Sequence, residues 1–267
     1  MEILVLILSS LISVLSPLNF AADKVAENAV RSQFKAAEVV KVRIDSAPLH
    51  NPILGKADKL RIATRGVYPL KSLRIDTIEL ETDPINISRQ QLAQKRGKLL
   101  LEEQLGIATR VVIKKDDVVK AILSPEIIDQ IQKLLGGSQK TKAFGLPDLK
   151  DFRLSNPKVE FLENQRVRLE AEIEQLSTAE KLKIEAETGL EFLDGQRLQL
   201  IKPTLSINGQ PIPPEFLDGI LATLTRELDL KRFETLLQVK ARVFKFQFKD
   251  DQLEVAAFIL LPKGLKL

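Results

Sequence analysis

The chain has 267 residues, 44% of them apolar, which suits one large globular domain or two small ones. It has no cysteine, no tryptophan and a single histidine, so disulfides, thiolate metal sites and any site that needs two imidazoles are excluded. Forty basic and 36 acidic residues give a net charge of +4, and aromatic residues make up only 5% of the chain. Nucleic-acid binders concentrate basic charge and stack bases on aromatic rings, so we expect no nucleic-acid partner.

The amino-terminal segment, residues 1–22, is uncharged from Ile3 onward. About twenty such residues would span roughly 30 Å as a helix, close to the thickness of the hydrocarbon layer. Several serines and Pro17 weaken it as a transmembrane helix. A cleaved signal peptide also fits poorly, because Glu2 replaces the usual basic residue and no small-residue cleavage site follows. We predict an uncleaved anchor or a segment lying in the membrane interface; a buried first helix of the domain is the alternative.

From Pro17 the pattern becomes that of an amphipathic helix, in which apolar residues recur every three or four positions with charged residues opposite. The apolar positions are Leu18, Ala22, Val25, Ala26, Ala29, Val30 and Phe34. This predicts a long helix over about residues 17–36 with one apolar stripe.

Beyond this helix apolar residues recur at every second position, which is typical of half-buried antiparallel strands. The alternation is clearest over residues 166–174 and 181–192, where one face is aliphatic and the other charged. Turn sequences separate the strands. They are Glu163-Asn164-Gln165, Leu176-Ser177-Thr178, Asp194-Gly195, Asn208-Gly209 and Asp250-Asp251. Such spacing builds hairpins, so we predict a mainly antiparallel sheet with strands of about ten residues or more.

The alternation slips by one position near Thr77, after Leu200 and after Val243. A one-residue slip turns the apolar side chains onto the wrong face unless the strand carries a β-bulge, which also bends it. We therefore predict bulges at these places and a strongly curved sheet. The alternative at each place is a strand end or a stretch that is apolar on both faces.

Further helices interrupt the strands. One is predicted over residues 116–122, and a second begins at Ser124 and ends near Leu135. Another begins near Pro213 and carries an apolar face as far as Leu228. The stretch near residues 136–147 is predicted to be a solvated loop.

No catalytic constellation is evident. We interpret Asp116-Asp117 as the first turn of a helix and Asp250-Asp251 as a hairpin turn rather than as metal ligands. We expect no cofactor, no metal site and no enzymatic activity; an enzyme with a carboxylate site is the least favoured alternative. Some basic residues could touch lipid phosphates or only form a solvated strand face. They are Lys231, Arg232, Lys240, Arg242, Lys245 and Lys249.

Several segments occur in an order that resembles a known family. They are Leu15-Ser16-Pro17, the helix from Lys24 to Phe34, Val42-Arg43-Ile44-Asp45, Gly55 to Ile62, Leu73 to Ile75 with Ile78 to Thr82 and Ile85 to Ile87, and Val111 to Ile113 leading to Asp116-Asp117-Val118. Together they resemble the LmeA-like phospholipid-binding family, a bacterial domain especially common in cyanobacteria. The resemblance is sharpest over residues 15–135 and continues to the end of the chain. At the last of these segments the family usually shows Thr-Glu-Glu-Asp-Leu-Asn, whereas this chain has Lys114-Lys115-Asp116-Asp117-Val118-Val119.

The resemblance implies a fold similar to tubular lipid-binding proteins, in which a long helix is wrapped by a curved antiparallel sheet around an apolar tunnel. It also implies phospholipid binding in the cell envelope and carries over no catalytic residues. We accordingly expect an α+β fold, with a long N-terminal helix packed on a strongly curved, bulged, mainly antiparallel sheet that forms a half-barrel. Residues 1–22 would be the hydrophobic segment and residues 23–267 a single elongated domain.

The expected function is non-enzymatic binding of phospholipid or another acyl lipid in an aliphatic groove. The protein would act at a membrane surface of the cell envelope, on its periplasmic or its thylakoid-facing side. The residues expected to line the groove are Leu60, Ile62, Leu73, Ile75, Ile78, Leu80, Val111 and Ile113. The alternative is a membrane-associated scaffold that binds a protein partner through its sheet.

Overall fold

A computed structural model describes most of the chain. The described residues are 23–47, 56–88, 100–126, 128, 152–176, 178–213, 217–218, 221–222, 225–226, 229–231, 234 and 238–265. The predicted membrane segment at residues 1–22 and the predicted loop near residues 136–147 lie outside them.

The contacts of the chain group into two compact units. The six-strand unit holds the described residues up to Ile113, together with Leu230–Lys245 and those from Glu254 onward. The five-strand unit holds those of Lys114–Asp229 together with Phe246–Leu253. Each unit is built on its own antiparallel ladders and is described here by itself.

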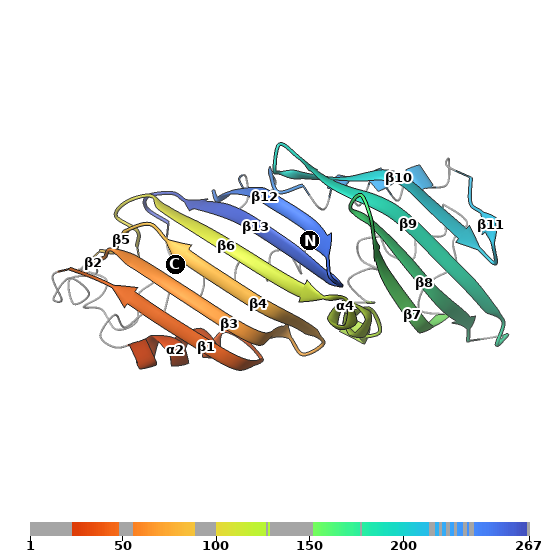
Figure 1. The fold of residues 1–267 in the computed structure, drawn as a ribbon, viewed down its shortest axis with the longest axis horizontal. Coiled ribbons are helices and arrows are strands. Elements are labelled where there is room, and N and C mark those ends of the chain that lie inside the picture. Colours follow the sequence, from red (N-terminus) through yellow and green to blue (C-terminus); the bar gives the residue numbers. More distant parts are fainter. Residues whose placement is uncertain are drawn as a thin grey trace. The chain divides into compact units, whose positions relative to one another are not determined.

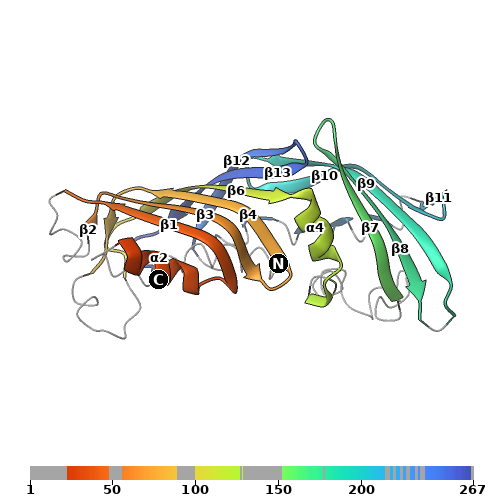
Figure 2. The ribbon, with the colours of Figure 1, turned by 60° about the horizontal axis from the view of Figure 1, so that its bottom comes forward.

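The six-strand unit is named for a sheet with the strand order β1-β3-β4-β6-β13-β12 (Figure 1). Its elements are α2 (Asp23–Ser32), β1 (Ala36–Asp45), β3 (Lys59–Leu70), β4 (Leu73–Thr82), β6 (Leu105–Lys114), and the larger parts of β12 (Lys240–Lys249) and β13 (Gln252–Leu261). The adjoining ends of β12 and β13, within Phe246–Leu253, belong to the five-strand unit. The short strands β2 (Lys56–Ala57) and β5 (Ile85–Asn86) form a separate pair. Figure 2 shows α2 on one face of the sheet, where it contacts β1.

Strand alternation places a row of apolar side chains on one face of this sheet. Ile62 lies directly opposite Leu80 in the β3–β4 ladder and opposite Val42 in the β1–β3 ladder, so the three side chains share a face. Each of them is at most 5% exposed. Ala26 and Val30 on the apolar stripe of α2 are fully buried. This part of the sheet therefore has a closed core.

The five-strand unit contains the sheet β11-β10-β9-β8-β7. Its elements are α4 (Lys115–Ile122), β7 (Phe152–Leu162), β8 (Arg166–Gln175), β9 (Lys181–Leu193), β10 (Arg197–Ile207) and β11 (Gln210–Pro211). Helix α4 contacts β7. The described residues between 217 and 226, which belong to the helix predicted to begin near Pro213, are helical.

The predicted antiparallel sheet and its hairpin turns are confirmed. Asn208-Gly209 joins β10 to β11 and Asp250-Asp251 joins β12 to β13, and all four residues have positive φ. Positive φ at both central residues is what a tight two-residue hairpin requires. The short helix over 116–122 is also confirmed, with Asp116 and Asp117 in its first turn.

The predicted amino-terminal helix ends earlier than expected. Helix α2 stops at Ser32, four residues before the predicted end at 36. The backbone N–H of Lys35 donates a hydrogen bond to the carbonyl of Tyr68, and β1 begins at Ala36. Pairing with β3 therefore competes successfully with a further helical turn. The part of this helix predicted before Asp23 lies outside the described residues.

One predicted bulge is confirmed and one is wrong. The register of β10 with β9 shifts between Ile201 and Thr204, as the slip after Leu200 predicts. Near Thr77 the registers of β4 with both neighbours are continuous. There Thr77 and Ile78 are both buried, so this stretch is covered on both faces and needs no bulge. The bulge after Val243 stays a prediction.

Each register shift in the described ladders contains a proline. The shifts lie between Val67 and Leu70, between Ser155 and Lys158, and between Ile201 and Thr204. The prolines are Pro69, Pro157 and Pro203. Proline has no N–H to donate to a ladder, so it is tolerated in a strand where an extra unpaired residue interrupts the pairing. Asn156 and Lys202, which precede two of these prolines, have positive φ.

Position 66 in β3 requires glycine, both for its backbone conformation and for the close approach of a neighbouring side chain. Its φ is +55°, and a Cβ at this position would overlap the carboxylate of Glu38, which pairs with Arg74. We expect Gly66→Ala to lower the free energy of unfolding by about 1–2 kcal/mol from backbone strain alone, and by more because Glu38 must move. Gly209→Ala is the matched control, since Gly209 also has positive φ (+77°) but nothing within 4 Å. Denaturant unfolding of both variants, with and without Glu38→Ala, measures the two contributions; equal losses would contradict the role of Glu38.

Three carboxylates each lie between two cations on exposed strand faces. Hydrogen bonds from Lys59 and Arg61 lower the pKa of Glu81, those from Arg166 and Arg168 lower the pKa of Glu187, and those from Arg110 and Lys245 lower the pKa of Glu254. A carboxyl whose pKa is lower in the folded state adds stability above its unfolded-state value, here 4.5. That stability is lost as the pH falls through the lower folded-state pKa.

We therefore expect the denaturation midpoint to be nearly constant between pH 7 and pH 5 and to fall below about pH 4.5. The effect is modest, because these groups are solvent-screened. Replacing all three with glutamine should lower the midpoint at pH 7 and flatten the fall at acid pH. An unchanged pH profile in the triple variant would assign the acid sensitivity to other groups.

Candidate functional site

The five-strand unit contains a cavity of about 430 Å³ lined almost entirely by apolar side chains. The lining comes from α4, from β7 to β10, from the helical stretch near Leu217 and from the adjoining ends of β12 and β13. The lining residues are Val118, Ile122, Val159, Phe161, Val167, Leu169, Ala186, Glu187, Thr188, Leu190, Leu200, Pro203, Thr204, Leu205, Leu217, Leu221, Phe248 and Leu253. Its size lies within the range of small-molecule sites.

Strand register explains why the centre of this face is hollow. Ala186 of β9 lies directly opposite Leu169 of β8 on one side and opposite Leu205 of β10 on the other. The three side chains share a face, and the smallest lies between the two leucines. Most lining residues of β8, β9 and β10 are only half-buried, whereas Val42, Ile62 and Leu80 on the apolar face of the six-stranded sheet are buried.

The polar atoms at this cavity are paired within the protein. The Thr188 hydroxyl donates its one proton to the carbonyl of Gly189 at 2.9 Å, with the carbonyl of Ile201 at 3.4 Å as the alternative acceptor, and the Thr204 hydroxyl donates to the carbonyl of Glu187. In the described part of the chain, the buried side-chain atoms without a partner belong to Ser46 and Asn86, and neither residue lines the cavity. The cavity therefore favours an apolar ligand that needs no directional partner.

Three features support the cavity wall. The bulge at Lys202-Pro203 places a proline ring in the lining of β10. The rings of Phe161 and Phe248 stack with centroids 4.5 Å apart. The carboxylate of Glu187 accepts hydrogen bonds from Arg166 at 2.7 Å and from Arg168 at 2.9 Å, which ties β8 to β9.

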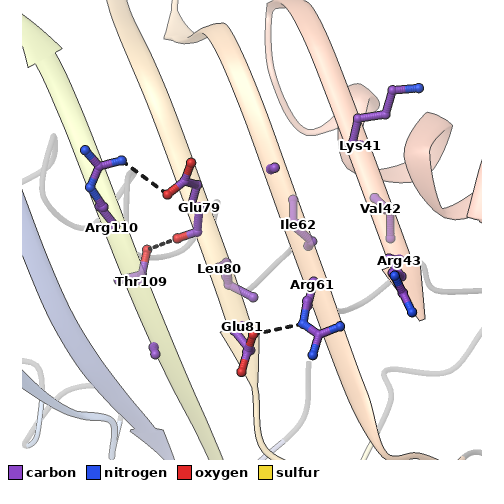
Figure 3. A pocket seen from close by; sticks show the side chains of 12 residues that line it. Lys41, Val42, Arg43, Arg61, Ile62, Glu79, Leu80, Glu81, Thr109 and Arg110 are labelled. Carbon is purple, nitrogen blue, oxygen red and sulfur yellow. Dashed lines mark hydrogen bonds and ion pairs between the residues drawn. The ribbon is translucent and has the colours of Figure 1, made fainter. Parts of the chain in front are cut away.

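A second depression, of about 490 Å³, lies on the charged face of the six-stranded sheet (Figure 3). Its charged side chains pair with one another across the strands. Arg110 contacts Glu79 at 3.2 Å and Glu254 at 2.6 Å, and Arg61 contacts Glu81 at 2.9 Å. Among the described residues no three acidic or histidine side chains form a group that could hold a metal ion. This depression is an ion-paired surface.

The eight residues predicted to line a groove all belong to the six-strand unit, and none lines the apolar cavity. Leu60, Ile62, Leu73, Ile75, Ile78 and Leu80 are buried, and Val111 and Ile113 are half-buried. Cross-strand pairing brings Ile62 beside Leu80, and Ile78 beside Val111. Leu73 and Ile75 alternate to the opposite face of β4 from Ile78 and Leu80. Ile62 and Leu80 also border the charged depression. Their role in a groove stays a prediction.

The sequence predicted the strands that line the cavity, but it did not predict that their residues form a site. The alternation at Val167 and Leu169, and again from Ile184 to Leu190, is the strongest in the chain. Alternation shows which side chains share a face, but not whether another element covers them. The one local signal is Ala186, a small residue in a row of larger aliphatic ones.

These observations define a class: an antiparallel β-sheet protein with an apolar cavity. The model of the LmeA-like phospholipid-binding family matches residues 15–258, and the chain belongs to this family. The resemblance seen in the sequence is therefore confirmed, and family membership indicates lipid binding. Neither the curated proteins nor the solved structures contain a match to the chain. In the described residues no helix is both long enough and apolar enough to cross a bilayer.

Proposed function

We propose that this protein binds a phospholipid, without enzymatic activity, and holds its acyl chains in the apolar cavity of the five-strand unit. The observation that supports this proposal is the cavity itself. It has a volume of about 430 Å³ and an aliphatic, half-buried lining, and its threonine hydroxyls already have hydrogen-bond partners. An acyl chain gains free energy from leaving water and requires no directional bond. The family to which the chain belongs supports a phospholipid over other apolar ligands.

Several finer features belong to the same proposal. The bulged strands would curve around the ligand as a half-barrel, with the helix before β1 extending toward the amino terminus. Residues 23–267 would act as one lipid-binding domain, held at a membrane of the cell envelope by residues 1–22. The residues predicted from sequence, such as Ile62 and Leu80, would line a groove within the six-strand unit if the core of that unit opens.

Native mass spectrometry of the full chain, purified from cells without detergent, tests the proposal. We expect a bound mass that is released on lipid extraction and identified as a phospholipid. Repeated purification of ligand-free protein, which also takes up no phospholipid from vesicles, would reject it. A stable protein partner with indifference to lipid would favour the scaffold alternative. The wide charged strand faces are its support, although many of their charges already pair with one another.

A further inference from the structure

The β12 segment of the six-strand unit carries the most exposed large hydrophobic side chain among the described residues. Phe244 is 73% exposed, compared with 43% for Val39, 44% for Leu123 and 58% for Leu176. Leaving an aromatic ring in water forgoes the free energy of burying it, so such exposure points to a contact made outside the isolated chain. The two later phenylalanines of β12 differ, because the rings of Phe246 and Phe248 pack against each other and against other rings.

Two basic residues precede Phe244 on β12 at alternate positions. Lys240, Arg242 and Phe244 occupy alternate positions and are all exposed, whereas Ala241 between them is buried. In the described part of the chain neither Lys240 nor Arg242 has an ion pair. Lys245 differs, since it pairs with Glu254 at 2.7 Å. Among the residues that the structure describes, β12 thus presents two exposed cations without an ion pair, within four residues of an exposed aromatic ring.

Strand β12 also lies at the end of the strand order, beyond β13 (Figure 1). Exposed basic residues on such an edge discourage pairing with the strand of another protein. One ring with two cations is also much smaller than the surface that a specific protein interface needs. The same set suits an anionic bilayer, where an aromatic ring inserts at the headgroup level and basic side chains meet lipid phosphates.

We propose that Lys240, Arg242 and Phe244 dock this protein on an anionic phospholipid bilayer. This inference rests on the proposed lipid binding, because a protein that takes up or delivers phospholipid must contact a membrane. Docking at this edge would bring the carrier to its source of lipid. The surface is distinct from the cavity, since none of the three residues lines it.

The chain has no tryptophan, so Phe244→Trp creates a single reporter in the full-length protein. We expect its emission to move to shorter wavelength with vesicles of phosphatidylglycerol and phosphatidylcholine, and to be quenched by lipids brominated on the acyl chain. Vesicles of phosphatidylcholine alone should produce a much smaller change. Unchanged emission with anionic vesicles would overturn the proposal. So would a shift that occurs without vesicles and grows with protein concentration, because it would indicate a second copy as the partner.

Vesicle co-sedimentation measures how much each of the three residues contributes to the affinity for the membrane. Lys240→Gln and Arg242→Gln should each weaken binding roughly fivefold at low salt, with a smaller effect at high salt. Phe244→Ser should weaken it roughly tenfold. Val39→Ser is the matched control, since Val39 is an exposed apolar residue on β1, the opposite edge strand, and its loss should change little. Equal binding of Phe244→Ser and the parent chain would overturn the proposal.

Lipid that co-purifies with Phe244→Ser separates this inference from the proposed function. Its amount should match that of the parent chain, because the substitution leaves the cavity lining unchanged. Weak vesicle binding with normal cavity lipid supports docking through β12. Absence of cavity lipid in the parent chain itself would reject the proposed function instead.

Discussion

Replacing Ala186 with tryptophan should remove most of the lipid that co-purifies with the protein. Ala186 lies between Leu169 and Leu205 at the centre of the cavity face, so the indole would occupy the space proposed for the acyl chain. Overpacking typically costs 1–3 kcal/mol. Because the cavity has free volume, we expect this cost to reduce the free energy of lipid binding rather than the free energy of unfolding. We expect the lipid-to-protein ratio, measured by mass spectrometry after extraction, to fall roughly tenfold.

A charge in the same cavity should act by a different route. Leu200→Asp places a carboxylate in the apolar lining, where an acyl chain would desolvate it at a cost of several kcal/mol. Gln199→Asp is the matched control, because Gln199 is the exposed neighbour on the other face of β10. It should retain lipid, with a small loss of stability from facing Glu191. Circular dichroism and thermal unfolding show whether each variant is folded. A folded Ala186→Trp or Leu200→Asp with the parent amount of lipid would exclude this cavity as the site.

The turns and strand faces of this protein could be predicted because they are local properties. Asn208-Gly209 requires positive φ whatever packs around it, and period-two alternation fixes which side chains point the same way. The bulge on β10 could be predicted from the slip in alternation after Leu200, which is also a local signal. The bulges near Pro69 and Pro157 were not predicted, although a proline within a strand was a signal for both.

The site could not be predicted because alternation does not reveal what covers a face. Leu60 and Leu169 belong to similar alternating strands, yet Leu60 is fully buried and Leu169 is half-exposed beside a cavity. The difference is set by the packing of other elements on each face, which the alternation within a strand does not report. The bulge predicted near Thr77 was wrong for the same reason. A stretch that is buried on both faces shows the same sequence pattern as a one-residue slip in alternation.

Truncating a leucine should therefore lower the free energy of unfolding much more in the six-strand unit than in the five-strand unit. Leu60→Ala removes a fully buried side chain from a closed core, and such changes cost about 2–5 kcal/mol because the neighbours relax only partly into the space. Leu200→Ala removes a half-buried side chain that already borders empty volume. This change opens no new cavity in a packed core. The free energy of unfolding should therefore fall by only about 1 kcal/mol, which is part of the free energy gained by burying the leucine side chain.

Lipid binding should show the reverse order. Leu200→Ala enlarges the cavity and removes a contact with the acyl chain, so the bound lipid should decrease or change in chain length, whereas a folded Leu60→Ala should retain the parent lipid. Hydrogen exchange measured strand by strand suits this comparison, because it reports β3 and β10 separately even if the two units open independently. If Leu60→Ala changes the bound lipid as strongly as Leu200→Ala does, the six-strand unit also binds lipid. The residues predicted from sequence, among them Ile62 and Leu80, would then line its own groove.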